Sequence, residues 1–217
     1  MSWSMRRRVT RRAVTAWTAA AWLASAAPAA PATSPAPAVA RFRFEPSRST
    51  VRFDADATTH VVHGVSHEMS GEVTFDPEDL SRAAAVKFRL ASASLETGNK
   101  VRDRKMRETH LEAARYPFIA FRSSKIAAIT PTLRAGETQE LSVEGTLSLH
   151  GVEHPVALVV KAARTGGVLR VTGETTLRLT DYAIPIPRFL FFKMKDEVKV
   201  MFEAVAIEVS PREGPRS

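Results

Sequence analysis

The chain has 217 residues, a formal net charge of +8 at pH 7 and no cysteine. The absence of cysteine excludes disulfides, thiol catalysis and a cysteine-linked lipid anchor. Five of the positive charges lie in the first 40 residues, which contain no acidic residue, so the rest of the chain has a net charge of only +3. Because no nucleic-acid motif accompanies this modest charge, we expect no nucleic-acid partner.

The first 40 residues have the succession that is typical of an export signal. Arginines between positions 6 and 12 precede an apolar stretch at 13–27, and small residues and prolines follow. We expect residues 1–40 to be an export signal, ordinary or twin-arginine, with a Pro/Ala-rich tether, and the protein to be periplasmic or secreted. An uncleaved anchor is the alternative, but about 15 mostly alanine residues are short for a membrane span of about 20.

Beyond residue 40, apolar and polar residues alternate in successive segments, as Leu141 and Val143 do with their neighbours in 141–149. This period of two is typical of antiparallel strands with one wet face. Eight or more such strands fit a sandwich or a barrel, and a barrel is favoured because it leaves no exposed edge. We therefore predict an all-β protein, with an antiparallel barrel of about eight strands at 41–210 and a disordered tail at 211–217. The expected strands are residues 41–45, 51–56, 71–76, 86–90, 117–129, 141–149, 155–163, 169–179 and 197–209.

One highly charged segment interrupts the strands. We expect a short helix from Lys100 to Arg115, because Met106 and His110 share an apolar face there and Asn99 stands where a helix cap would. The helix should end before Pro117, since a residue that precedes proline is pushed out of the helical region. One face would pack on the barrel, and the charged face would be solvated.

Asp103 falls within the apolar stripe of this helix, and Arg107 follows one turn later. A carboxylate on a packed face needs partners, because an unpaired buried charge is costly. We predict that Asp103 is at least partly buried and either pairs with a cation or caps backbone amides.

A second unusual segment, residues 184–195, combines bulky apolar residues with prolines and cations. Two prolines argue against a regular central strand. The segment should either plug the core or line the entrance to a cavity, with Arg188, Lys193 and Lys195 near lipid headgroups and transient contact with a membrane surface. Its apolar members are Ile184, Ile186, Phe189, Leu190, Phe191 and Phe192.

The histidines His60, His63 and His67 are the feature most open to a metal-binding or enzymatic role. Residues 60 and 63 would point to opposite faces of a strand, so they chelate a metal poorly unless the strand bends, although Glu68 could join them. No nucleophile elbow, phosphate loop or His-Glu-x-x-His pattern is present. We expect no catalytic residues, no metal ligands and no enzymatic activity, with an exported metal-binding or enzymatic protein as the alternative.

Short motifs occur in order along residues 45–209. They are His63-Gly64 with Gly71, Ser94-Leu95-Glu96-Thr97, Arg102-Asp103, Leu111, Tyr116-Pro117, Phe121, Glu144 to Val152 with Pro155-Val156, and Asp181-Tyr182-Ala183-Ile184. Together they resemble the signatures of the YceI-like family of bacterial polyisoprenoid-binding proteins. The segment Asp103-Arg104-Lys105-Met106 departs from the Asp-x-His-Leu of many members.

The resemblance implies a lipocalin-like barrel that is exported and holds a polyprenyl or quinone tail in an apolar tunnel. We expect binding without chemistry, for carriage or storage, no cofactor beyond the bound lipid or quinone, and a monomer or homodimer. A structural envelope protein with a filled barrel is a further alternative. The residues expected to bind the ligand are Phe53, Phe75, Phe88, Leu90, Met106, Leu111, Phe118, Phe121, Ile184, Phe189, Phe191 and Phe192.

Overall fold

The computed structural model describes residues 39–80, 83–128, 130, 132–189 and 192–209. The predicted export signal, except for its last two residues, and the predicted C-terminal tail lie outside this part of the chain. Among the described residues, no helix is long and apolar enough to cross a membrane.

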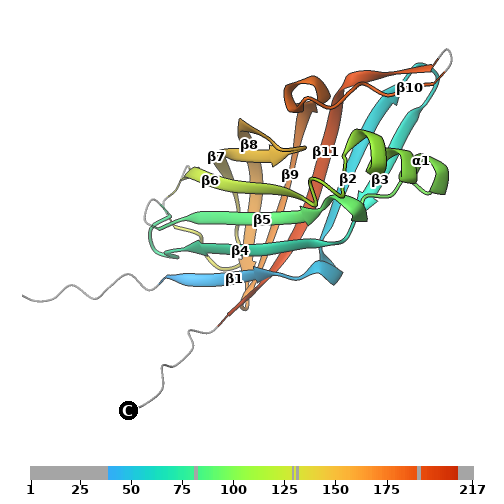
Figure 1. Ribbon diagram of the computed structural model, residues 1–217. Helices are drawn as coiled ribbons and strands as arrows, with labels where there is room; N and C mark the ends of the chain where they lie inside the picture. Colours follow the sequence, from blue (N-terminus) through green and yellow to red (C-terminus); the bar gives the residue numbers. More distant parts are fainter. Residues whose placement is uncertain (1–38, 81–82, 129, 131, 190–191, 210–217) are drawn as a thin grey trace, which may run out of the picture. The chain divides into compact units, whose positions relative to one another are not determined.

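Eleven strands form one antiparallel sheet within the described residues (Figure 1). They are β1 (Ala40–Phe44), β2 (Thr50–Ala57), β3 (Val61–Ser66), β4 (Met69–Phe75), β5 (Ala85–Ala91), β6 (Phe118–Ala128), β7 (Thr138–Leu149), β8 (Val152–Thr165), β9 (Val168–Arg178), β10 (Arg188–Phe189) and β11 (Phe192–Glu208).

Eight of these strands close into a barrel. The neighbours follow the order β1-β4-β5-β6-β7-β8-β9-β11, and β11 pairs again with β1, where Phe44 lies opposite Ala206. Further along the same edge of β11, where β1 has ended, the β2–β3 hairpin takes its place, with Val51 opposite Phe202. The predicted antiparallel barrel of about eight strands is confirmed, and β11 is the strand that closes it.

The alternation of side chains along the strands sorts the apolar residues to the inside. On β7, Leu141, Val143 and Leu147 are buried, and Ser142 and Glu144 between them are exposed. On β8 the pattern leaves Val159 on the outer face, 63% exposed. Because successive side chains of a strand point to opposite faces, every second residue fills the barrel interior and the residues between them face water.

The helical segment is shorter than predicted. Helix α1 (Lys100–Lys105) continues as a π-helical turn (Met106–His110) and does not reach Arg115. The chain leaves the helical region at Glu112, whose φ of 43° is left-handed, so the helix ends before the Tyr-Pro step. Three short 3-10 turns lie at Pro46–Arg48, Ser92–Ser94 and Leu179–Tyr182.

The expected helix cap and the buried carboxylate are both present. The side chain of Asn99 accepts hydrogen bonds from the backbone amides of Val101 and Arg102, each at 3.1 Å. Asp103 is 7% exposed and accepts a hydrogen bond from the backbone amide of Thr97 at 2.8 Å. The prediction that Asp103 is buried and caps a backbone amide is therefore confirmed.

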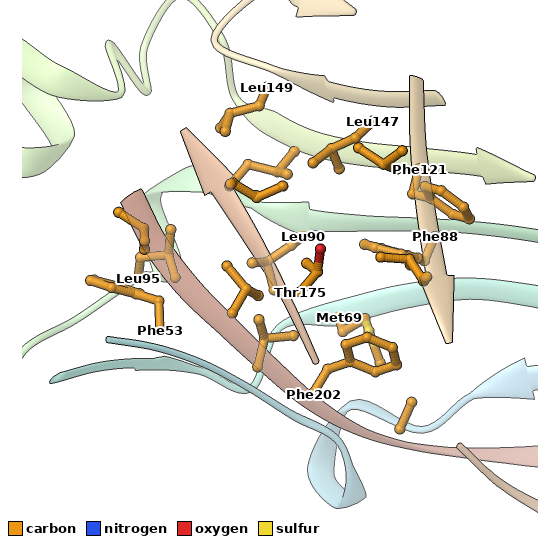
Figure 2. Close-up of a pocket in the computed structure, with 18 of the residues that line it drawn as sticks. Phe53, Met69, Phe88, Leu90, Leu95, Phe121, Leu147, Leu149, Thr175 and Phe202 are labelled. Carbon is orange, nitrogen blue, oxygen red and sulfur yellow. The ribbon is translucent and has the colours of Figure 1, made fainter. Parts of the chain in front are cut away.

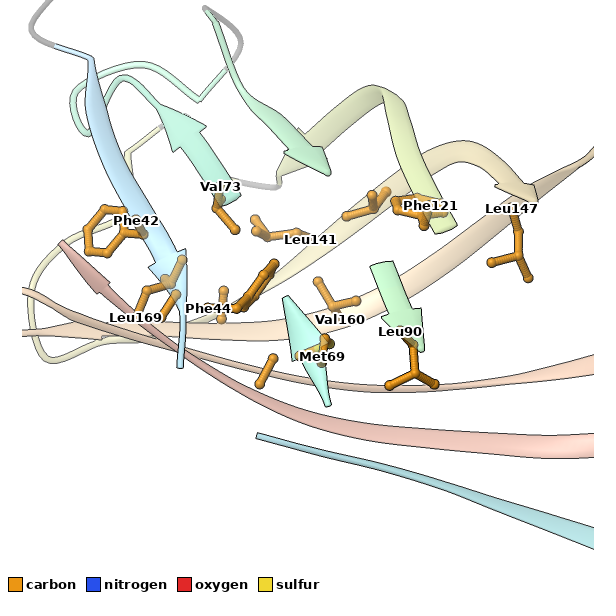
Figure 3. Close-up of a cluster of buried hydrophobic side chains, with 14 of the residues drawn as sticks. Phe42, Phe44, Met69, Val73, Leu90, Phe121, Leu141, Leu147, Val160 and Leu169 are labelled. Carbon is orange, nitrogen blue, oxygen red and sulfur yellow. The ribbon is translucent and has the colours of Figure 1, made fainter. Parts of the chain in front are cut away.

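Aromatic and aliphatic side chains fill the barrel beside β1 (Figure 3). The rings of Phe42 and Phe75 stack with their centroids 5.3 Å apart, and Phe42 is fully buried. Two residues outside the strands, Leu80 and Leu133, are each only 3% exposed. The connections that follow β4 and β6 thus add apolar side chains to the core.

Candidate functional site

The barrel interior contains a cavity of about 750 Å³. Barrels of about eight strands have room for their own side chains or for one small ligand, and this volume lies in the range of ligand pockets. On β11 the lining runs from Met194 to Ala204, which corresponds to roughly 30 Å of strand. The cavity is therefore elongated and large enough for a ligand, and the protein's own side chains do not fill the barrel interior completely.

The wall of the cavity is almost entirely aliphatic and aromatic. Figure 2 shows labelled side chains from several strands around the same space, with the hydroxyl oxygen of Thr175 among them. The rings of Phe88 on β5 and Phe121 on β6 stack at 5.5 Å. Phe53 on β2 can lie flat against β3 because its neighbour there is Gly64, where a Cβ atom would fall 2.0 Å from the ring.

Eight of the residues predicted to bind a ligand line this cavity. They are Phe53, Phe75, Phe88, Leu90, Met106, Leu111, Phe121 and Ile184. The structure thus gathers side chains from four strands, the helical segment and the loop after β9 around one space. Contact between these residues and a ligand stays a prediction.

Phe118 was wrongly expected to line the cavity. It is 47% exposed, and the guanidinium carbon of Arg89 lies 4.8 Å from the centre of its ring on the outer face of the barrel. Phe118 and Phe121 are three positions apart on one strand, so they point to opposite faces, and the packing places Phe121 inside.

The entrance residues Phe189, Phe191 and Phe192 cannot be placed on the wall. Phe191 and the side chains of Phe189 and Phe192 lie outside the described part of the structure. Their flanks, Pro187 and Lys193, do line the cavity. The role of these aromatic residues as an entrance or a plug therefore stays a prediction.

Strands β8 and β11 contribute wall residues that were not singled out from the sequence. Leu158 and Val160 on β8, and Val198, Val200 and Phe202 on β11, all line the cavity. On β11 the polar residues Glu197, Lys199 and Glu203 flank these side chains, whereas Leu158 and Val160 lie in a continuous apolar run. These patterns identified the strands, but they did not show which apolar faces would border the cavity.

One group of polar lining residues lies beside α1. Thr97, Asn99, Arg102, Lys105 and His110 all border the cavity there. The spacing of Arg102 and His110 from Met106, four residues on either side, was the signal that could have placed both on the inner face of the helix.

Arg102 is held in place by hydrogen bonds. Its Nε donates to the hydroxyl of Thr97 at 2.7 Å, and its Nη2 donates to the backbone carbonyl of the same residue at 3.0 Å. Thr97 is in turn fixed by Asp103, which accepts from its amide and its hydroxyl. The buried carboxylate therefore positions a guanidinium at the edge of an apolar cavity.

Cations from other strands border the same cavity. Arg178, at the end of β9, and Lys193, near the start of β11, are part of the lining together with His60. Arg178 Nε lies 3.2 Å from the carboxylate of Asp196. With Arg102 and Lys105, four cationic side chains border the cavity, and no aspartate or glutamate does so among the described residues.

His110 joins the helical segment to the loop after β9. Its Nδ1 lies 3.2 Å from the backbone carbonyl of Pro185, which can only accept, so Nδ1 carries the proton. Partial burial lowers the pKa of His110 below its ordinary 6.5, the hydrogen bond to Pro185 opposes this, and the charge of Lys105 adds to it. The neutral ring is the form that this environment favours.

The three clustered histidines have separate partners. His63 Nδ1 lies 2.6 Å from a carboxylate oxygen of Asp54, and His67 Nδ1 lies 3.3 Å from the carbonyl of Ser49. His60 contacts the hydroxyl of its neighbour and borders the cavity. In the described ranges no three His, Asp or Glu side chains are grouped as metal ligands would be, so the metal-binding alternative has no ligand set there.

Solved structures share this architecture. BcnA of Burkholderia cenocepacia has a TM-score of 0.64 at 22% identity, over 75% of this chain and 98% of that one. A polyisoprenoid binding domain of Saccharophagus degradans, described as implicated in plant cell wall breakdown, has a TM-score of 0.63 at 19% identity, over 77% and 98%. The YCEI protein of Campylobacter jejuni has 0.56 at 18%, over 69% and 86%. At these identities the likeness shows the fold alone.

Sequence comparison agrees with the fold. A UPF0312 protein of Vibrio campbellii (strain ATCC BAA-1116) is 26% identical over 132 residues, which are 58% of this chain and 66% of that protein. The match thus spans just under two thirds of that relative's length. The model of the YceI-like domain matches residues 42–206, nearly the whole barrel. The chain therefore belongs to the YceI-like family.

Proposed function

We propose that the protein binds one isoprenoid-like lipid, with a polyprenyl or quinone tail, in its barrel, and that it carries or stores this lipid as an exported protein. The observation that supports the proposal most directly is the long cavity of about 750 Å³ with an almost wholly apolar wall. The domain of Saccharophagus degradans with the same fold is described as polyisoprenoid binding.

Apolar burial would provide the affinity. Each methylene group that leaves water for such a wall contributes about 0.8 kcal/mol before the costs of ordering are subtracted. A long hydrocarbon chain presents many such groups, whereas a compact polar metabolite would leave its hydrogen bonds unmet against this wall. The wall therefore favours a chain-like lipid over a polar substrate.

The polar lining beside α1 suggests the orientation of the lipid. Arg102 and Lys105 border the cavity next to Met106, and no carboxylate borders it among the described residues. We infer that the tail extends along β11 and that the polar or anionic end group stays near these cations. An anionic end group would gain charge-assisted hydrogen bonds there.

The lining also favours binding without chemistry. It contains no serine, cysteine, aspartate or glutamate among the described residues, so its histidines, His60 and His110, have no carboxylate beside them in the cavity wall, and the hydroxyl of Thr97 is already hydrogen-bonded to Asp103 and Arg102. General acid–base or nucleophilic catalysis needs such pairs within hydrogen-bond reach. The presence of the cavity also argues against the alternative of a structural envelope protein with a completely filled barrel.

Native mass spectrometry of the purified protein tests the proposal. We expect an adduct with the mass of a prenyl lipid or quinone, which organic extraction removes. A bound metal would instead support the metal-binding alternative, and a bare chain that also fails to take up a fluorescent polyprenyl probe would refute lipid binding.

A further inference from the structure

We propose that the outer face of α1 docks the protein on an anionic bilayer surface. We define this docking face as Lys100, Val101 and Arg104. The proposal rests on the lipid-binding function proposed above, because an isoprenoid-like lipid is dissolved in a membrane and the barrel has to reach it there. It goes further, since it names the surface that makes contact and the charge of the membrane.

The two sides of α1 have different surroundings. Arg102 and Lys105 border the cavity, whereas Lys100 and Arg104 are exposed and do not belong to its lining. Val101 borders the cavity and is also 68% exposed. The docking face therefore adjoins the cavity lining at Val101, and a membrane in contact with it would lie next to the cavity.

The cations of the docking face lack the ion pairs that several cations of the barrel wall make. On the wall, Lys125 lies 3.3 Å from Glu144 and Lys199 lies 2.9 Å from Glu174, each opposite a carboxylate on a neighbouring strand. No carboxylate lies within 4 Å of Lys100 or Arg104 anywhere in the described ranges.

The local acids do not neutralise the docking face. Asp103 is buried and accepts from Thr97. Glu108, the exposed acid of the helical segment, follows Arg104 by four positions, but its carboxylate does not lie within 4 Å of the Arg104 guanidinium. Lys100 and Arg104 are four positions apart on one helix, where two like charges repel each other slightly. An anionic surface would relieve that repulsion, and this is the complementarity that selects an anionic membrane as the partner.

An exposed valine fits the same partner. A single exposed apolar residue is ordinary on a protein surface, but Val101 stands between two cations and at the edge of the cavity. Basic residues around an apolar side chain are the pattern by which surface helices bind the interface of anionic membranes. Val61, the first residue of β3, is a second exposed valine and follows the cavity-lining His60.

The test compares two variants of the full chain, each lacking two positive charges. Lys100→Gln with Arg104→Gln alters the docking face, and Lys161→Gln with Arg170→Gln alters exposed positions on β8 and β9. Binding is measured by co-sedimentation with vesicles of phosphatidylglycerol and phosphatidylcholine and with vesicles of phosphatidylcholine alone. The N-terminal apolar segment is common to all variants, so differences between them report on the barrel.

We expect the wild type to prefer the anionic vesicles and to lose that preference in high salt. Each cation at the surface is worth about a fivefold change in partitioning, so the docking-face variant should bind roughly 25-fold more weakly and the control variant about as well as the wild type. Val101→Ser should weaken binding several-fold without a change in charge. An equal loss in both double variants, or equal wild-type binding to both vesicles, would overturn the proposal.

A separate measurement distinguishes failure of docking from failure of lipid binding. Uptake of a polyprenyl probe from detergent micelles needs the cavity and no bilayer, so the docking-face variant should take up the probe as the wild type does. If the wild type takes up the probe but does not bind anionic vesicles, the docking proposal alone is wrong. If the wild type takes up no probe, the lipid-binding function is wrong.

Discussion

The carboxylate of Asp103 and the backbone amide of Thr97 are joined by a hydrogen bond of 2.8 Å, although neither residue lies in the barrel wall. Asp103 is on α1, and Thr97 belongs to the segment that enters it. That segment also pairs with β3, where Val65 and Glu96 exchange backbone hydrogen bonds of 2.8 and 3.0 Å. One buried carboxylate thus fixes α1 to the edge of the β2–β3 hairpin.

Replacement of this carboxylate should destabilise the protein. In Asp103→Ala the Thr97 amide and hydroxyl lose their acceptor, and we expect a loss of about 1–3 kcal/mol in the free energy of unfolding, measured with urea. Asp103→Asn keeps one acceptor oxygen and should lose less. An alanine variant as stable as the wild type would contradict the role that we give to this hydrogen bond.

Phe121 and Phe118 form a natural pair for a test of the cavity wall. Phe121 is 4% exposed and lies over Gly145, so Phe121→Ala should cost about 3 kcal/mol and weaken uptake of a polyprenyl probe. Phe118→Ala removes an equally large ring from the outer face and should change stability by less than about 1 kcal/mol and leave uptake unchanged. Equal effects at the two positions would mean that the assignment of faces on β6 is wrong.

A charge on the wall should prevent lipid binding. Leu158 points into the cavity from β8, and its neighbour Val159 is 63% exposed on the outside. Leu158→Asp would place a carboxylate against the hydrocarbon tail, where neither water nor a partner can meet it, and uptake of the probe should be lost. Val159→Asp carries the same charge on the wet face, and its uptake should match that of the wild type.

The stability of the protein should depend on the charge of His110. Burial lowers the pKa of this group in the folded state, so the unfolded chain binds the proton more readily. The contribution of His110 is therefore complete above about pH 6.5 and is lost as the pH falls through the lower, folded value. The free energy of unfolding, measured by urea at pH 7.5 and pH 5, should fall less in His110→Gln than in the wild type. A parallel fall in both would show that other groups cause the pH dependence.

The strands and their wet faces could be predicted because they follow from local chemistry. The alternation of Leu141 and Val143 with polar residues marks one face of β7, whatever the rest of the fold does. Local sequence could not show which of Phe118 and Phe121 points inward, because both are aromatic and each lies on an apolar stretch. The face that each side chain takes depends on how β6 packs against its neighbouring strands.

The end of the helix and the size of the cavity could not be read from the chain. Glu112 is an ordinary helix-forming residue, and its left-handed φ of 43° depends on its surroundings, where His150 Nε2 lies 3.3 Å from its carboxylate. The cavity is the difference between the space that the barrel encloses and the volume of the inward side chains. That difference depends on the closure of strands far apart in the sequence, such as β1 and β11.

The position of β11 has a consequence for the way the chain must fold. Of the described strands it is the last in the sequence, and it supplies partners to β9, β1 and β2 at once. Until it has emerged, these three strands have unpaired edges, and an unpaired edge is a site where chains associate wrongly. Closure of the ring also waits for contacts of very high sequence separation, which form slowly. A newly synthesised chain therefore cannot enclose its cavity until β11 has paired with these strands.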